Sequence, residues 1–147
     1  MTDSSPPAHS LYEEMGLVQI VELDPEGRAS IEYEAREAQC HSGGVVQGGF
    51  VTGWIDAAMA HAAMAKNGQH KVPMTLEMKV SFFAPARPGI VLAEGWVERH
   101  GRRTSFYEGH LKASDGTIIA KASSTMLLMD TVKVLAASKA AREGDMQ

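Results

Sequence analysis

The feature that most constrains the fold of this chain is a long apolar segment from Phe50 to Lys66. Between Phe50 and Ala65 the only clearly polar side chains are Thr52, Asp56 and His61. The segment is rich in Ala and Met, and Gly68 follows it as a stop signal, so a helix is predicted. A helix that is apolar on all sides is buried on most of them. A flat sheet touches only one side, so we predict a strongly curved antiparallel sheet wrapped around this helix.

Strand patterns lie on both sides of the helix. Residues 17–23 and 29–35 flank an Asp-Pro-Glu-Gly turn and are predicted to form a hairpin. After the helix, alternation and turn signals predict four strands, over residues 75–82, 90–99, 104–113 and 117–129. A short helix over Leu11 to Met15 precedes the hairpin, and a glycine-rich irregular loop leads into the long helix. The fold class is therefore α+β.

The length of 147 residues fits one domain of ordinary size. Residues 1–9 are small and polar and are expected to be disordered. Residues 10–130 are expected to form the single domain. Residues 131–147 are rich in Ala and Lys and are expected to form a weak helix or a frayed tail.

The composition argues against several classes of function. The net charge of −4 argues against a basic nucleic-acid-binding protein. Asp56 and His61 make the longest uncharged stretch a poor membrane span, and the first residues lack a signal-peptide pattern, so a cytoplasmic protein is expected. A single cysteine, Cys40, excludes an internal disulfide and a Cys-rich metal site. Neither the histidines nor the acidic residues have the spacing of a metal site.

The charge is unevenly distributed along the chain. Residues 1–38 hold nine acids and two bases, which sums to −7, whereas residues 85–112 hold five bases and three acids, which sums to +2. An anionic ligand would therefore meet the second region more readily. Within it, Arg102 and Arg103 occupy a predicted hairpin turn. They form either a solvated tip or a clamp for phosphate oxygens.

Asp56 is the outlier of the apolar helix. A carboxylate among apolar side chains is usually paired, protonated or functional, because burying it unpaired costs several kcal/mol. Three interpretations stay open at this point: a functional carboxylate, a structural polar group with a partner, or a helix face open to solvent.

The start of the helix offers a second candidate site. Gln47, Gly48 and Gly49 precede the apolar segment, and the first N–H groups of a helix have no intrahelical partner. Such groups can bind an anion or an oxyanion, although a Gly-Gly pair also serves as a simple turn. His41 lies six residues before Gln47 in the same loop, as a surface residue or as a member of this site.

These motifs together resemble the hotdog-fold acyl-CoA thioesterases of the 4-hydroxybenzoyl-CoA and phenylacetate-degradation group. The segment from His41 to Gly49 resembles the family loop, and Asp56 lies nine residues after Gln47, at the family spacing. The stretch from Thr75 to Pro85 matches the following family strand, and the turns at 101–103 and 115–116 match later ones. Two residues differ: Gln47 stands where the family has His, and His41 stands where it has Asn or Gln.

The resemblance implies a curved sheet around a central helix and hydrolysis of an acyl-CoA thioester. Asp56 would be the nucleophile or general base. The Gly48 N–H would polarise the thioester carbonyl, and Thr75 would position the water or the carboxylate. His41 and Gln47 would complete the site. The resemblance further implies a homodimer or a dimer of dimers, with sites at the subunit interface.

The ligands follow from the same resemblance. Arg102 and Arg103 would meet the phosphates of CoA, which is part of the substrate, and no separate cofactor is expected. The sequence allows either an aryl or a medium-chain acyl group. The candidate residues for its pocket are Phe50, Trp54, Met59 and Phe82. A non-catalytic acyl-CoA-binding protein, a hotdog hydratase and a purely structural domain are the other interpretations.

Overall fold

The computed structural model describes residues 10–145, so the disorder expected for residues 1–9 lies outside the described part. The chain forms three α-helices and eight strands within that part. The helices and longer strands are α1 Leu11–Met15, β1 Leu17–Asp24, β2 Arg28–Ala35, α2 Gly48–Asn67, β5 Lys71–Phe82, β6 Gly89–Arg99, β7 Thr104–Ala113, β8 Ile118–Asp130 and α3 Thr131–Gly144. Two short strands, β3 Cys40–His41 and β4 Val45–Val46, pair with each other in the glycine-rich loop.

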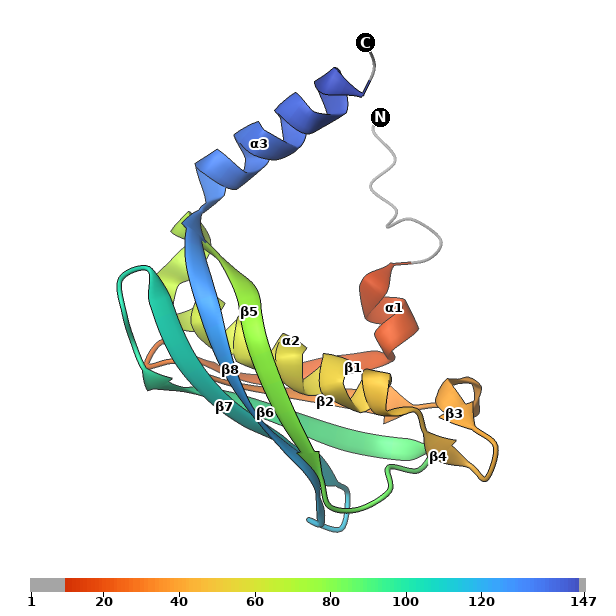
Figure 1. Ribbon diagram of the computed structural model, residues 1–147. Coiled ribbons are helices and arrows are strands. Elements are labelled where there is room, and N and C mark those ends of the chain that lie inside the picture. The colour runs from red at the N-terminus through yellow and green to blue at the C-terminus, as the bar shows by residue number, and fades with distance from the viewer. Residues whose placement is uncertain (1–9, 146–147) are drawn as a thin grey trace.

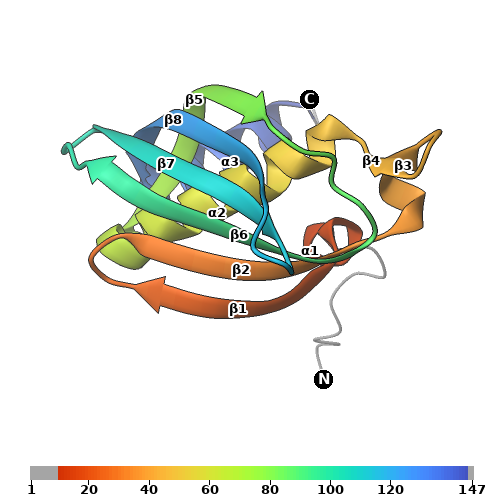
Figure 2. The same ribbon diagram turned by 90° about the horizontal axis from the view of Figure 1, so that it is seen from below.

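Six strands form one antiparallel sheet in the order β1-β2-β6-β7-β8-β5. The sheet curves around α2, which runs along its concave side (Figure 1, Figure 2). This arrangement confirms the predicted curved antiparallel sheet around one long helix. β1 and β5 are the two edge strands, and they lie on opposite sides of α2.

The close contact between α2 and the sheet depends on two glycines. Gly95 of β6 and Gly109 of β7 are cross-strand partners in the middle of the sheet. A Cβ atom built on Gly95 would lie 2.6 Å from the backbone nitrogen of Met59, and one on Gly109 would lie 2.9 Å from the side chain of Ile55. No side chain fits between helix and sheet at this point, so the helix rests directly on the strand backbone.

The burial of α2 is less complete than its composition suggested. Its fully buried side chains, Val51, Trp54, Ile55, Ala58, Met59, Ala62 and Ala63, face the sheet. Asp56, Ala57, Ala60 and His61 are only half-buried, and Met64 is exposed. The helix is therefore buried against the sheet, and these residues on its other side are half-buried except for Met64.

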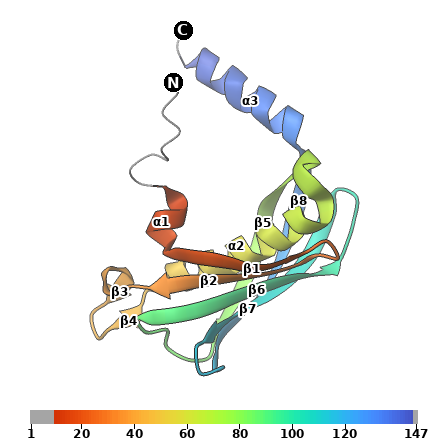
Figure 3. The same cartoon turned by 180° about the vertical axis from the view of Figure 1, so that it is seen from behind.

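Two elements differ from the sequence prediction. β5 begins at Lys71 rather than Thr75, and it includes Pro73, which an edge strand tolerates because one side of its backbone has no ladder partner. Residues 131–144 form the regular helix α3, which projects away from the sheet (Figure 1, Figure 3). It is attached at its base, where the Thr131 hydroxyl donates to the Gln69 carbonyl at 2.5 Å.

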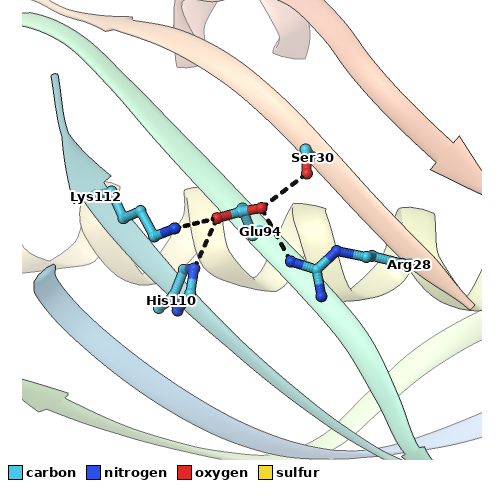
Figure 4. A network of polar contacts seen from close by, with 5 residues as sticks. All are labelled: Arg28, Ser30, Glu94, His110 and Lys112. Carbon is cyan, nitrogen blue, oxygen red and sulfur yellow. Dashed lines mark hydrogen bonds and ion pairs between the residues drawn. The ribbon is translucent and has the colours of Figure 1, made fainter. Parts of the chain in front are cut away.

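The outer face of the sheet, opposite α2, carries a buried carboxylate. Glu94 of β6 accepts hydrogen bonds or ion pairs from Arg28 at 3.1 Å, Ser30 at 3.1 Å, His110 at 2.9 Å and Lys112 at 2.8 Å (Figure 4). Burial alone raises the pKa of Glu94. The hydrogen bonds from Lys112, His110 and Ser30 outweigh that effect and lower the pKa to about 2. Glu94 is therefore ionised at neutral pH and holds β2, β6 and β7 together.

Candidate functional site

Asp56 and Thr75 form one pair of polar side chains beside the edge of the sheet. The Thr75 hydroxyl donates a hydrogen bond to Asp56 Oδ1 at 2.7 Å. Asp56 lies on the open face of α2, and Thr75 lies on the edge strand β5. The half-buried carboxylate has one defined partner, and its other oxygen is available to a ligand. Of the three interpretations of Asp56, this geometry favours a carboxylate that is oriented by a neighbour and reachable from outside.

Gly48 is the first residue of α2 and faces an apolar cavity. Gln47 is the N-cap, and its side chain accepts from the Gly49 N–H at 2.8 Å. The Gln47 side chain therefore caps the Gly49 N–H and leaves the Gly48 N–H uncapped. The first N–H of a helix has no intrahelical carbonyl to bond. The cavity beside it measures about 440 Å³, and its wall includes His41, Gly48, Phe82 and Phe83.

His41 and Gln47 have different local roles. His41 Nδ1 lies 2.9 Å from the Ser42 carbonyl, to which it can donate, which leaves Nε2 as the free ring nitrogen. Gln47 is exposed and is engaged in capping, and its backbone N–H donates to the Gln39 carbonyl at 2.9 Å. His41 and Gly48 thus line the same cavity, whereas the side chain of Gln47 caps the start of α2.

The two groups lie apart within one chain. Asp56 follows Gly48 by eight residues on the same straight helix, and at about 1.5 Å per residue the two are separated by about 12 Å. One thioester carbonyl cannot contact both groups at that distance. The candidate residues therefore fall into two separate groups, called half-sites below: Asp56 with Thr75, and Gly48 with His41.

Arg102 and Arg103 line a cationic groove of about 560 Å³ together with Lys71 and Lys133. Asp130 is the acidic residue of the groove, and it pairs with Lys71 at 2.8 Å and with Lys133 at 3.8 Å. These contacts, Lys71 first, lower the pKa of Asp130. The groove therefore keeps an excess of positive charge. The sequence analysis missed Lys71 and Lys133, because strand β5 was expected to start later and α3 was expected to be a weak helix or a frayed tail.

Two candidate pocket residues are excluded by their position. Trp54 and Met59 are fully buried between α2 and the sheet, and the Trp54 indole donates to the Met15 carbonyl at 2.7 Å. They belong to the core and line no substrate pocket. Phe50 is half-buried and packs against Trp54, with ring centroids 6.3 Å apart. Phe82 lines the cavity beside Gly48, and it is 53% exposed.

Residues 10–145 contain neither a metal-binding cluster nor a membrane-spanning helix. No group of His, Cys, Asp and Glu side chains in this range is arranged to hold a metal ion. No helix of the same range has the length and apolar character needed to cross a membrane.

Comparison with known proteins agrees with the fold and with the family. Residues 43–120 match the family model of the thioesterase superfamily. Protein SSO2140 of Saccharolobus solfataricus, a proposed esterase, is 32% identical over 114 residues, which cover 78% of this chain and 80% of that protein.

Solved structures extend the comparison. A proposed thioesterase related to phenylacetic acid degradation, from Ralstonia eutropha JMP134, superposes with a TM-score of 0.74 at 28% identity, over 86% of this chain and 93% of the other. A variant of the phenylacetic acid degradation protein PaaI from Thermus thermophilus superposes with a TM-score of 0.69 at 26% identity, over 79% and 96% of the two chains. The curved sheet around α2 is the hotdog fold, and the chain belongs to the thioesterase superfamily.

Proposed function

We propose that this protein hydrolyses the thioester of an aryl- or medium-chain acyl-CoA, with Asp56 as the catalytic carboxylate. The observation that carries the proposal is the oriented, reachable Asp56 carboxylate, held by the Thr75 hydroxyl at 2.7 Å on the open face of an otherwise apolar helix. Membership of the thioesterase superfamily gives the reaction class.

Asp56 can act in two ways. As a general base it takes a proton from water while the water oxygen attacks the thioester carbonyl. As a nucleophile it attacks the carbonyl itself and forms a mixed anhydride, which water then hydrolyses. In both cases the carbon–sulfur bond breaks, the CoA thiolate leaves and takes up a proton, and a carboxylic acid is the second product. Thr75 keeps the carboxylate in position in either route.

The Gly48 N–H stabilises the negative charge that develops on the carbonyl oxygen. A backbone N–H at a helix start is preorganised for this task because it points away from the helix and lies at the positive end of the helix dipole. Since about 12 Å separates Gly48 from Asp56 in one chain, the Gly48 that serves one carboxylate belongs to a second copy. A twofold dimer then builds two identical sites from four half-sites.

The cationic groove supplies the binding site for CoA phosphates in this proposal. Arg102 and Arg103 are suited to phosphate because each guanidinium presents paired N–H donors. Lys71 and Lys133 add charge at the same groove. No cofactor beyond the CoA of the substrate is required.

The first experiment measures thiol release from acetyl-, hexanoyl-, lauroyl-, phenylacetyl- and 4-hydroxybenzoyl-CoA, with the wild type beside Asp56→Asn. We expect hydrolysis by the wild type and a loss of about 100-fold or more in the variant, the scale of a lost catalytic group. Hydrolysis that is unaffected by the substitution would remove Asp56 from the mechanism. CoA binding without hydrolysis of any member would favour a non-catalytic acyl-CoA-binding protein.

A complementation experiment tests the two half-sites. Gly48→Pro removes the N–H, and proline is tolerated at the first position of a helix. Gly48→Ala keeps the N–H and is the matched control, since its Cβ meets only the exposed ring of Phe82 at 3.3 Å. Coexpression of Asp56→Asn with Gly48→Pro yields mixed dimers in which one site has both native groups. With random pairing we expect about a quarter of wild-type activity. No recovery from two inactive variants would contradict the shared site.

A further inference from the structure

A second apolar cavity lies at the other end of α2, away from Gly48. It measures about 430 Å³, and its wall includes Leu23, His61, Met64, Ala65, Val72 and Thr131. These residues come from the β1–β2 hairpin, the C-terminal half of α2, the start of β5 and the start of α3. The volume lies within the range of small-molecule sites. None of the residues proposed for catalysis contributes to this wall.

Two polar side chains in the wall of this cavity, His61 and Lys71, have partners within the chain. His61 Nδ1 lies 2.7 Å from the Ala57 carbonyl, one turn earlier on α2, so this nitrogen donates to the helix. The Lys71 ammonium pairs with Asp130 at 2.8 Å. Leu23 and Met64 contribute apolar surface and are 49% and 38% exposed. The cavity therefore presents a mainly apolar surface. Lys71 lies in the wall of both this cavity and the cationic groove, but Arg102, Arg103 and Lys133 line only the groove, so the excess of positive charge lies there.

The open face of α2 leads from Asp56 to this cavity. Asp56, Ala60 and Met64 follow one another at intervals of four residues and so share one side of the helix. Ala57 and Ala60 are small and half-buried, and His61 is the one larger α2 side chain among residues 57–63 that is not fully buried against the sheet. Along the helix axis, the eight residues from Asp56 to Met64 span about 12 Å.

This distance sets the length of an acyl group. Carbon–carbon bonds of about 1.5 Å at an angle of about 111° advance an extended chain by about 1.25 Å per bond. About ten carbons are needed to reach from a carbonyl at Asp56 to the level of Met64. A phenylacetyl group ends roughly one helical turn beyond Asp56, near Ala60, and leaves the cavity unfilled.

We infer that the cavity at His61 and Met64 binds the distal end of a straight acyl chain, and that the preferred substrates are acyl-CoAs of about ten to twelve carbons. The inference rests on the proposed thioesterase activity and narrows its substrate class. Each methylene that enters the cavity raises kcat/KM by up to about fourfold, the value of one buried CH₂ group. The cavity beside Gly48, lined by Phe82, then has no part in selecting chain length.

The test is a chain-length profile of kcat/KM with saturated acyl-CoAs from butanoyl to hexadecanoyl, with phenylacetyl-CoA included. The wild type is expected to peak at about ten to twelve carbons. Met64→Trp fills the cavity and should lower dodecanoyl-CoA hydrolysis at least tenfold while changing hexanoyl-CoA hydrolysis less than twofold. Met64→Ala enlarges the cavity and should move the peak to longer chains. Leu135→Trp, at an exposed position on α3, is the control and should leave the profile unchanged.

The outcomes separate this inference from the proposed function. No hydrolysis of any acyl-CoA by the folded wild type overturns both. Hydrolysis with a preference for phenylacetyl-CoA, or a profile that neither Met64 variant shifts, overturns the inference and leaves the thioesterase activity standing. A profile that shifts with Phe82→Trp and not with the Met64 variants places the acyl chain beside Gly48 and likewise overturns it.

Discussion

Replacement of Glu94 by glutamine is predicted to make the protein less stable at neutral pH and less sensitive to acid. Glu94 is 10% exposed and faces Arg28, His110 and Lys112 on the outer side of the sheet (Figure 4). The amide of Glu94→Gln keeps the shape of the side chain but removes the charge that these three groups share. Loss of one member of such a buried cluster leaves its partners without compensation.

The magnitude follows from the pKa of Glu94, which the fold lowers from 4.5 to about 2. A carboxyl with a lowered folded-state pKa stabilises the protein above its unfolded-state pKa, and this stabilisation is lost as pH falls toward the folded-state value. This pKa difference corresponds to a contribution of about 3 kcal/mol to the free energy of unfolding at neutral pH. About 2 kcal/mol of that contribution is lost by pH 3. Arg28 and Lys112 are 42% and 34% exposed, so solvent screening reduces these values.

Urea unfolding of wild type and Glu94→Gln at pH 7 and pH 3 measures the effect. We expect the free energy of unfolding of the wild type to fall by about 2 kcal/mol more than that of the variant between the two pH values. Glu34→Gln, which removes an exposed carboxylate of β2 outside the cluster, is the control and should retain the wild-type pH response. Equal losses in wild type and Glu94→Gln would refute the argument.

Four other predictions test separate parts of the structure. Gly95→Ala forces a Cβ against the α2 backbone and should cost about 3 kcal/mol in urea unfolding, and a neutral result would contradict the close contact. Thr75→Val should lower kcat more than Thr75→Ser, and equal rates would remove its hydrogen bond from the mechanism. His41→Asn, which keeps a hydrogen-bonding side chain in the wall of the cavity beside Gly48, should retain more activity than His41→Ala, and equal rates would remove this side chain from the mechanism. Arg102→Ala combined with Arg103→Ala should raise KM for acyl-CoA and weaken its salt dependence, with kcat little changed.

The fold could be predicted from the sequence because its main signals are local. Alternation of apolar and polar residues identified β7 as Thr104–Ala113 and identified β6 to within one residue, since each strand of this sheet has one face on α2. The apolar segment from Phe50 to Lys66 predicted one central helix with a curved sheet around it. The short helix α1 was likewise predicted with its correct bounds, and the Ser10 side chain caps it by accepting from the Glu13 N–H at 3.2 Å.

The start of β5 and the helix α3 were harder to predict, for identifiable reasons. Pro73 argues against a strand unless the strand lies at a sheet edge, and strand order is a property of the whole fold. Residues 131–144 have favourable helix formers but few apolar residues, so their pattern could not distinguish a regular helix from a frayed tail. Both misses affected the site, because Lys71 and Lys133 of the cationic groove belong to these elements.

The candidate site residues are predictions from the sequence, and the resemblance already implied that each site lies at a subunit interface. The eight residues from Gly48 to Asp56 make slightly more than two turns of one helix, so both lie near one side of α2 and look like neighbours in a sequence pattern. The rise of the helix nevertheless places them about 12 Å apart, too far to hold one carbonyl carbon and its oxygen. In the proposed mechanism the Asp56 carboxylate and a Gly48 N–H therefore act in one site because a second copy of the chain supplies the Gly48 N–H. The same rise also sets the distance from Asp56 to the cavity at Met64, so in the proposed mechanism α2 accounts for both the partner chain and the length of the acyl chain.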